Sequence, residues 1–177
     1  MTLFLYRMMG AAMLDAGMYE GIEHDHRVTR QAAAAVVLSS LAAGLCVGGW
    51  YEGGPQVFIF FSAVALLTWV AWAVMTFHIG TRILPGRETS ATLGELLRTT
   101  GFAASPGLLQ AFGMFPGMAI PVSIVTWMWM FAAMVFGVRH ALDYESTGRA
   151  LAVCGLAAAL ALTMAIVSGV LFGPTLH

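Results

Sequence analysis

The chain has 177 residues, of which 59% are hydrophobic and only 10% are charged, and its formal net charge is -1. Soluble domains average about 45–50% apolar and about 25% charged residues, so this composition excludes a soluble enzyme, a disordered segment and a coiled coil. The near-neutral charge also removes any case for nucleic-acid binding. We therefore expect an all-α, polytopic integral membrane protein in contact with the lipid bilayer.

Residues 1–30 are predicted to form an N-terminal cytoplasmic segment. Within it, residues 3–20 place small and apolar side chains on one helical face, namely Leu3, Tyr6, Gly10, Met13, Leu14 and Gly17. Arg7 interrupts the apolar stretch and no cleavage site follows, so we do not expect a secretory signal. The pattern predicts one amphipathic helix that lies on the inner leaflet.

Five transmembrane spans are predicted in residues 31–173. A bilayer core of about 30 Å needs about 20 helical residues. Stretches with few or no charged residues place the spans at about 31–50, 56–79, 99–115, 119–140 and 150–173. Residues 174–177 then form a short outer tail. No internal repeat or linker divides this single transmembrane domain.

The third span is the weakest of the five. It contains Thr99, Thr100, Ser105, Gln110 and three glycines, and Pro106 predicts a bend because proline removes a backbone donor. Thr92 to Glu95 match a capping box, which predicts that a helix starts there and rises into this span.

The arginines favour a crossing by this weak span. If residues 99–115 cross, all eight arginines lie on one side and none on the other; if they do not, the split is six to two. The positive-inside rule prefers the first arrangement. We therefore expect an inner (cytoplasmic) membrane protein whose N-terminus is cytoplasmic and whose C-terminus is on the outer face.

The predicted spans offer little chemistry. They hold no acid and no basic side chain at depth, which argues against a pump or an ion-coupled transporter. Ser39, Ser40 and Ser105 lack the surroundings of a nucleophile. Cys46 and Cys154 lie in apolar runs and are interpreted as packing residues. We expect no enzyme, no catalytic residue and no cofactor.

Four histidines fall on the predicted inner interface: His24, His26, His78 and His140. Imidazole beside carboxylate oxygens could bind zinc or iron. The sequence has no ordered pair such as His-Glu-x-x-His, so polar interfacial residues are the favoured interpretation and no metal is expected. A chlorin or haem ligated by one of the last two is disfavoured because both lie at helix ends.

Small residues at a spacing of four predict close helix packing, because they let backbones approach where lipid offers no hydrophobic drive. On the first span these are Ser40, Gly44 and Gly48, and on the fifth they are Ala161, Ala165, Gly169 and Gly173. Packing within one chain is favoured over packing between two copies, and a homo-oligomer stays open.

These observations favour binding to a protein partner as the function. The residues expected to contact it are inner arginines and fourth-span tryptophans, namely Arg27, Arg30, Arg82, Arg98, Arg139, Trp127 and Trp129. The favoured hypothesis is a non-catalytic scaffold or adaptor that binds another integral membrane protein. The alternatives are an accessory subunit of an energy-transducing or pigment–protein complex, and a small permease.

Several motifs resemble the short prokaryotic-type members of the Yip domain family. They are the pattern L-x-x-x-x-Y-E-x-I-E-x-D over residues 14–25, Thr29-x-Gln31-Ala32, residues 97–109, residues 138–142 and residues 147–150. The resemblance implies a five-helix membrane protein with a cytoplasmic N-terminus. Eukaryotic members bind prenylated Rab-type GTPases through a longer cytoplasmic arm with an acidic-aromatic Gly-Pro motif, which is not found in this sequence.

Overall fold

The computed structural model describes residues 2–51, 54–86 and 91–172, with side chains for all of these except 48–51, 162 and 164–172. Its helices are α1 (Thr2–Ala12), α2 (Ala16–His24), η1 (His26–Val28), α3 (Thr29–Tyr51), α4 (Gly54–His78), η2 (Ile79–Ile83), α5 (Leu93–Ala103), η3 (Ser105–Met114), α6 (Ala119–Ala141) and α7 (Thr147–Phe172). η1 and η3 are 3-10 helices, and η2 is a π-helical turn. The described residues form no strand, and the all-α prediction is confirmed.

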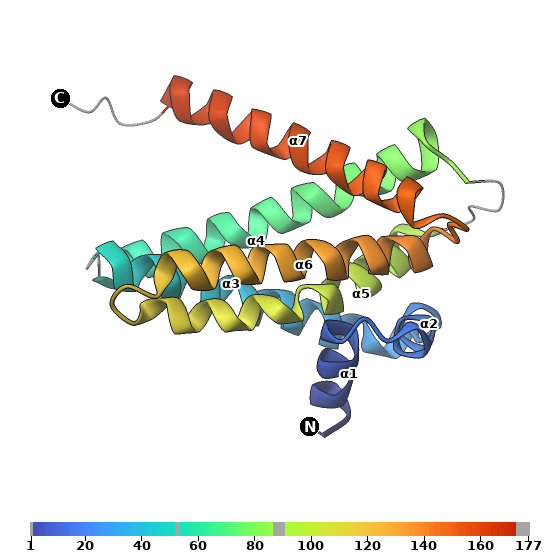
Figure 1. The fold of residues 1–177 in the computed structure, drawn as a ribbon, viewed down its shortest axis with the longest axis horizontal. Helices are drawn as coiled ribbons and strands as arrows, with labels where there is room; N and C mark the ends of the chain where they lie inside the picture. The colour runs from blue at the N-terminus through green and yellow to red at the C-terminus, as the bar shows by residue number, and fades with distance from the viewer. Residues whose placement is uncertain (1, 52–53, 87–90, 173–177) are drawn as a thin grey trace.

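The long helices lie side by side in a bundle. α3 contacts α4, α5 and η3, while α6 packs against η3 and α5. α7 contacts α6, α4 and η2, and it diverges from the bundle toward its C-terminal end (Figure 1). The core contains many alanines with almost no exposed surface, among them Ala35, Ala73, Ala103, Ala133 and Ala157. Such small side chains let helix backbones approach closely.

Three helical segments are long and apolar enough to cross a membrane: His26–Val47, Gly54–Ile83 and Ala119–Ala141. They coincide with the first, second and fourth predicted spans. A shorter apolar segment, Thr147–Ala161, overlaps the fifth predicted span within the described residues. The protein is therefore a membrane protein by the length and composition of its helices. A count of five spans stays a prediction.

The weak third span is a broken helix. α5 ends at Ala103, and the chain continues as the 3-10 helix η3 with Pro106 in its first turn. The capping box before α5 is present, because the Thr92 hydroxyl accepts the Glu95 N–H while the Glu95 carboxylate accepts the Thr92 N–H. A 3-10 run of ten residues is unusually long. The break therefore changes the helix type from α to 3-10.

The single amphipathic helix predicted over residues 3–20 is wrong, because the structure divides this stretch into α1 and α2. Leu14 lies between them with a φ of 62°, in the left-handed region. Asp15 then caps α2, its carboxylate accepting the Met18 N–H at 3.2 Å. The side chain of an N-cap aspartate accepts a hydrogen bond from a backbone N–H that, in a continuous helix, would donate to a backbone carbonyl. Asp15 therefore favours the start of a new helix. The placement of α1 on the inner leaflet stays a prediction.

α1 runs crosswise to the long helices, and its N-terminal end points away from the bundle (Figure 1). Arg7 forms an ion pair with Asp25 at 3.2 Å and donates to Gln31 at 3.0 Å, which ties α1 to the start of α3. Met8 and Ala11 are buried, whereas Leu3, Tyr6 and Met9 are more than half exposed. The outward side of α1 is therefore apolar.

Candidate partner-binding face

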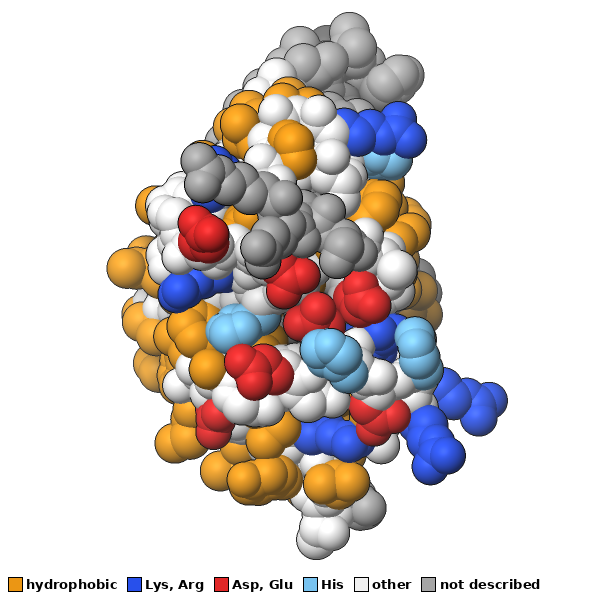
Figure 2. Space-filling model, turned by 90° about the vertical axis from the view of Figure 1, so that its right-hand side faces the viewer, with side chains coloured by type: hydrophobic (Ala, Val, Ile, Leu, Met, Phe, Trp, Pro, Cys, Tyr) orange, Lys and Arg blue, Asp and Glu red, His pale blue; other side chains and the backbone are white. Residues whose placement is uncertain are grey.

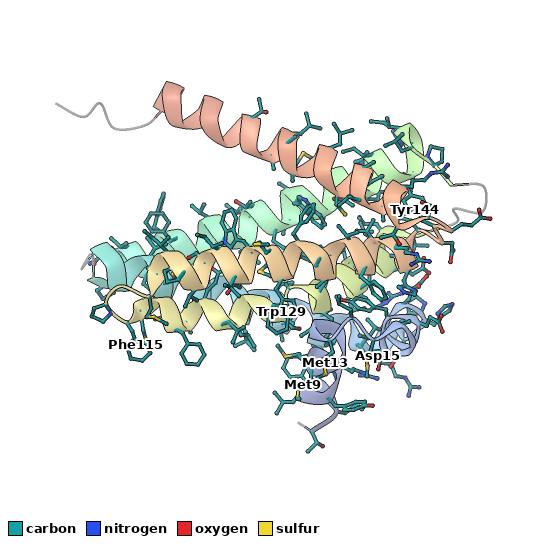
Figure 3. All side chains as sticks on the ribbon, viewed as in Figure 1. Met9, Met13, Asp15, Phe115, Trp129 and Tyr144 are labelled. Carbon is teal, nitrogen blue, oxygen red and sulfur yellow. The ribbon has the colours of Figure 1, made fainter. Side chains whose placement is uncertain are left out.

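Charged side chains gather at one end of the bundle. Figure 2 views this end directly and shows acidic, basic and histidine side chains spread across it. α2, η1, the start of α5 and the connection between α6 and α7 meet here, with Tyr144 at this end and Phe115 at the other (Figure 3). We call this surface the charged end. It carries charges of both signs, as the sequence predicted for the inner face.

Three of the predicted arginines are free at the charged end. Arg27, Arg30 and Arg82 are exposed, and their side chains have no hydrogen bond or ion pair to any described residue. Guanidinium groups recognise carboxylates with two parallel hydrogen bonds when a partner supplies them. These three side chains are therefore available to an outside partner.

Arg98 is used inside the protein. Its side chain is buried, with 2% exposed surface, and it lies on α5. Nε and Nη2 both donate to the Glu23 carbonyl oxygen, the first at 3.0 Å, and Nη1 donates to His26 Nδ1 at 3.2 Å. These bonds attach the end of α2 to α5. Arg98 thus holds the charged end together instead of presenting a charge on it.

Arg139 also bonds within the chain. It donates to the Tyr144 carbonyl at 3.3 Å and to the Thr147 hydroxyl at 3.0 Å, which shapes the connection between α6 and α7. The Tyr144 hydroxyl in turn lies 2.9 Å from the Gly80 carbonyl and 2.8 Å from that of Leu84, at the π-helical turn η2. Sequence reasoning missed Tyr144, since no local pattern reveals a contact over sixty residues.

Glu23 is a buried acid within the charged end. Burial raises the pKa of its carboxyl to about 7, and the nearby carboxylates of Asp143 and Glu95 add to the increase. Its neighbour His24 is exposed, and a hydrogen bond to the Glu20 carbonyl raises the pKa of its imidazole. Glu23 therefore titrates near neutral pH.

We expect the protein to lose stability between about pH 5 and pH 7.5. A carboxyl with a higher pKa in the folded state binds protons more tightly there, so the free energy of unfolding falls as pH rises through this range. The loss due to Glu23 is about 1–2 kcal/mol. Glu23→Gln should remove most of this decline in thermal melts at pH 5, 6, 7 and 8. His24 titrates in the same direction and stays in both proteins, so an unchanged pH dependence in the variant would contradict the assignment.

The four candidate metal-binding histidines do not converge. His26 accepts from Arg98, and His78 lies against the Phe77 ring. His140 stacks on Tyr19 with a ring separation of 6.0 Å, while His24 bonds to the Glu20 carbonyl. Among the described residues, no group of three or more His, Cys, Asp or Glu side chains could hold a metal ion. These contacts give each histidine a local structural role.

The two predicted interface tryptophans have different surroundings on α6. Trp127 is 70% exposed and offers a large apolar surface to lipid or to a partner. Trp129 is 41% exposed, and its Nε1 donates to the Ala12 carbonyl at the end of α1, at 2.7 Å. Figure 3 shows Trp129 above Met13, the residue that follows Ala12. Trp129 therefore anchors α1 to the bundle.

The structure describes only part of the predicted small-residue packing. A Cβ added at Gly44 would overlap the Ser62 hydroxyl and lie 2.7 Å from the Phe58 carbonyl, so Gly44 faces α4 of the same chain. Ser40 lies near Trp69 of α4 at a small cavity. The structure does not describe the contacts of Gly48, Ala165 and Gly169, and Gly173 lies outside the described residues.

A second set of close contacts joins α3 to the broken helix. Added Cβ atoms at Gly101 and Gly107 would lie 2.9 Å from the side chains of Ala32 and Ser39, and one at Gly113 would overlap Cys46 Sγ. The glycines recur every six residues, which is two 3-10 turns for the step from Gly107 to Gly113 within η3. Their partners on α3 recur every seven residues, or about two α-helical turns. We call this contact the glycine seam. The regular glycine spacing was visible in the sequence but was interpreted only as a weak span.

Comparison with known protein families gives a match over most of the chain. The family model described as the Yip1 domain matches residues 23–168, which is most of the chain. The match begins at Glu23 near the end of α2 and ends within α7, so it leaves out α1 and includes the helices from α3 to α6 in full. Neither the curated proteins nor the solved structures contain a significant match to this chain.

Proposed function

Since the chain belongs to the Yip1 domain family, we propose that it is a non-catalytic membrane scaffold or adaptor that acts by binding another integral membrane protein. The observation that carries this proposal is the charged end, where Arg27, Arg30 and Arg82 are exposed without partners among the described residues. Opposite charges across an interface give orientation and specificity. The exposed Trp127 on α6 adds an apolar anchor that a partner helix could cover.

We propose that the charged end faces the cytoplasm, with the N-terminus on that side and the C-terminal tail on the other. This orientation requires five crossings. The uncharged part of this segment consists of residues 99–103 of α5 and the 10 residues of η3. At about 1.5 Å per α-helical residue and about 2.0 Å per 3-10 residue, it extends about 28 Å. That length is close to the hydrocarbon core of about 30 Å. The extended 3-10 geometry thus supports a crossing by a segment that would be too short as a continuous α-helix.

The proposed function is tested by isolating the protein from its native membranes with a partner attached. We expect mild solubilisation followed by mass spectrometry to recover a stoichiometric integral membrane protein. A single partner supports an adaptor, whereas several respiratory or photosynthetic subunits would support the alternative of an accessory subunit. A lone chain in several mild detergents would contradict the binding role.

Two variants test the role of the charged end in that experiment. Arg27→Gln together with Arg30→Gln should reduce partner recovery about tenfold or more, because both side chains are exposed and have no partner among the residues that the structure describes. The matched control keeps the charge at the same positions, as Arg27→Lys with Arg30→Lys, and should retain most of the partner. Equal recovery with both pairs would show that the partner binds elsewhere.

A further inference from the structure

A small cavity, partly open to the outside, lies between α3, α4 and η3. Its volume is about 60 Å³, and its largely apolar lining includes the polar side chains of Ser39, Ser40, Trp69 and Gln110. Ser40 is the middle residue of the 23-residue α3, so the cavity lies at the centre of the predicted first span. It also adjoins Ala104, where α5 ends and the 3-10 helix begins.

The polar groups of this cavity have few partners within the described part of the chain. Ser39 donates to the Ala104 carbonyl at 2.7 Å, but the Ser40 hydroxyl has no hydrogen bond. The Gln110 amide has a single long contact, 3.8 Å to Met130 Sδ. Trp69 Nε1 is buried and has no acceptor. Ser40 and Gln110 are themselves 7% and 8% exposed.

Such groups are costly at this depth. A buried amide or hydroxyl without a hydrogen bond costs about 1–3 kcal/mol in proteins, and lipid tails supply neither donors nor acceptors. One water molecule takes up about 30 Å³ in the liquid, so 60 Å³ accommodates about two. A benzene-sized solute needs about 150 Å³. Water is thus the ligand that fits both the size of this cavity and its chemistry.

We propose that the cavity is a hydration site inside the membrane domain, in which one or two ordered water molecules bridge Ser40 of α3 and Gln110 of η3. Trp69 of α4 lies on the same cavity and supplies a third hydrogen-bonding side chain from a third helix. The water attaches η3 to its neighbours at the point where the third crossing is broken. The site is independent of the charged end and of any partner bound there.

The test uses the full chain in lipid nanodiscs with ¹⁵N-labelled glutamine side chains. The sequence has three glutamines, and only Gln110 remains in the double variant Gln31→Glu with Gln56→Glu. We expect the Gln110 amide protons to show nuclear Overhauser contacts to water, while a soluble gadolinium chelate broadens Gln56 in the wild type but spares Gln110. Contacts to acyl-chain protons without any to water would overturn the proposal, as would broadening equal to that of Gln56.

A pair of serine variants checks the bridging partner. Ser40→Ala should at least halve the water contact of Gln110, because the water loses a hydrogen-bonding side chain. Ser62→Ala is the matched control, since Ser62 is also a buried serine without a partner but does not line the cavity. A signal that is unchanged by Ser40→Ala would contradict the bridge. If neither variant folds, the wild-type measurement decides alone.

Discussion

Gly44→Leu is expected to lower the free energy of unfolding by about 3 kcal/mol, one of the largest single-residue effects in this protein. Any Cβ at this position overlaps the Ser62 hydroxyl, and the nearby Phe58 carbonyl belongs to the backbone of α4 and cannot rotate away. The two helices must therefore separate. Unfolding in mixed micelles with increasing dodecyl sulfate measures the change.

Gly155→Leu is the control for Gly44→Leu. Gly155 lies in α7, and a Cβ added there meets no atom within 4 Å. This substitution should be neutral or slightly stabilising, because glycine is a poor helix residue. Since Gly44 faces α4 of its own chain, Gly44→Leu should alter stability more than oligomer size. A dissociated oligomer with unchanged stability would mean that this glycine packs against a second copy.

Arg98→Ala is expected to cost about 3 kcal/mol and to release α2 from the bundle. The substitution removes every donor that Arg98 gives to the Glu23 carbonyl and His26, and it leaves that buried carbonyl unsatisfied. Limited proteolysis by a glutamate-specific protease should then cleave after Glu20 or Glu23 at least tenfold faster than in the wild type.

Arg27→Ala is the matched control for that experiment, because it removes the same side chain from an exposed position without a partner at the same end. Its melting temperature and its cleavage rate should stay close to those of the wild type. If the two alanine variants had the same melting temperature and cleavage rate, the buried hydrogen bonds of Arg98 would not stabilise the fold.

Hydropathy and charge predicted much of this fold. The first, second and fourth spans were predicted from runs of apolar residues. The structure has helical segments at the same three places, and each is long and apolar enough to cross a membrane. The gathering of charge at one end followed from the arginine positions. Both features depend on local composition, which a sequence displays directly.

Features that depend on distant contacts could not be predicted in the same way. Arg98 was expected to face a partner, but its guanidinium finds the Glu23 carbonyl 75 residues earlier in the chain. Trp129 was expected at an interface, and it bonds to Ala12. The division of the N-terminal helix at Leu14 was in principle predictable, because Asp15 is a favourable N-cap.

The central claim is that the broken helix formed by α5 and η3 crosses the membrane and so places the whole charged end on the cytoplasmic side. Single cysteines at Ile83, Met118 and Glu145, all of them exposed, test it in a background where Cys46 and Cys154 are replaced by serine. In intact cells, an impermeant maleimide should label Met118→Cys and should reach Ile83→Cys and Glu145→Cys only after lysis. Labelling of Ile83→Cys and Met118→Cys from the same side would show that the segment between them does not cross, and would contradict the account.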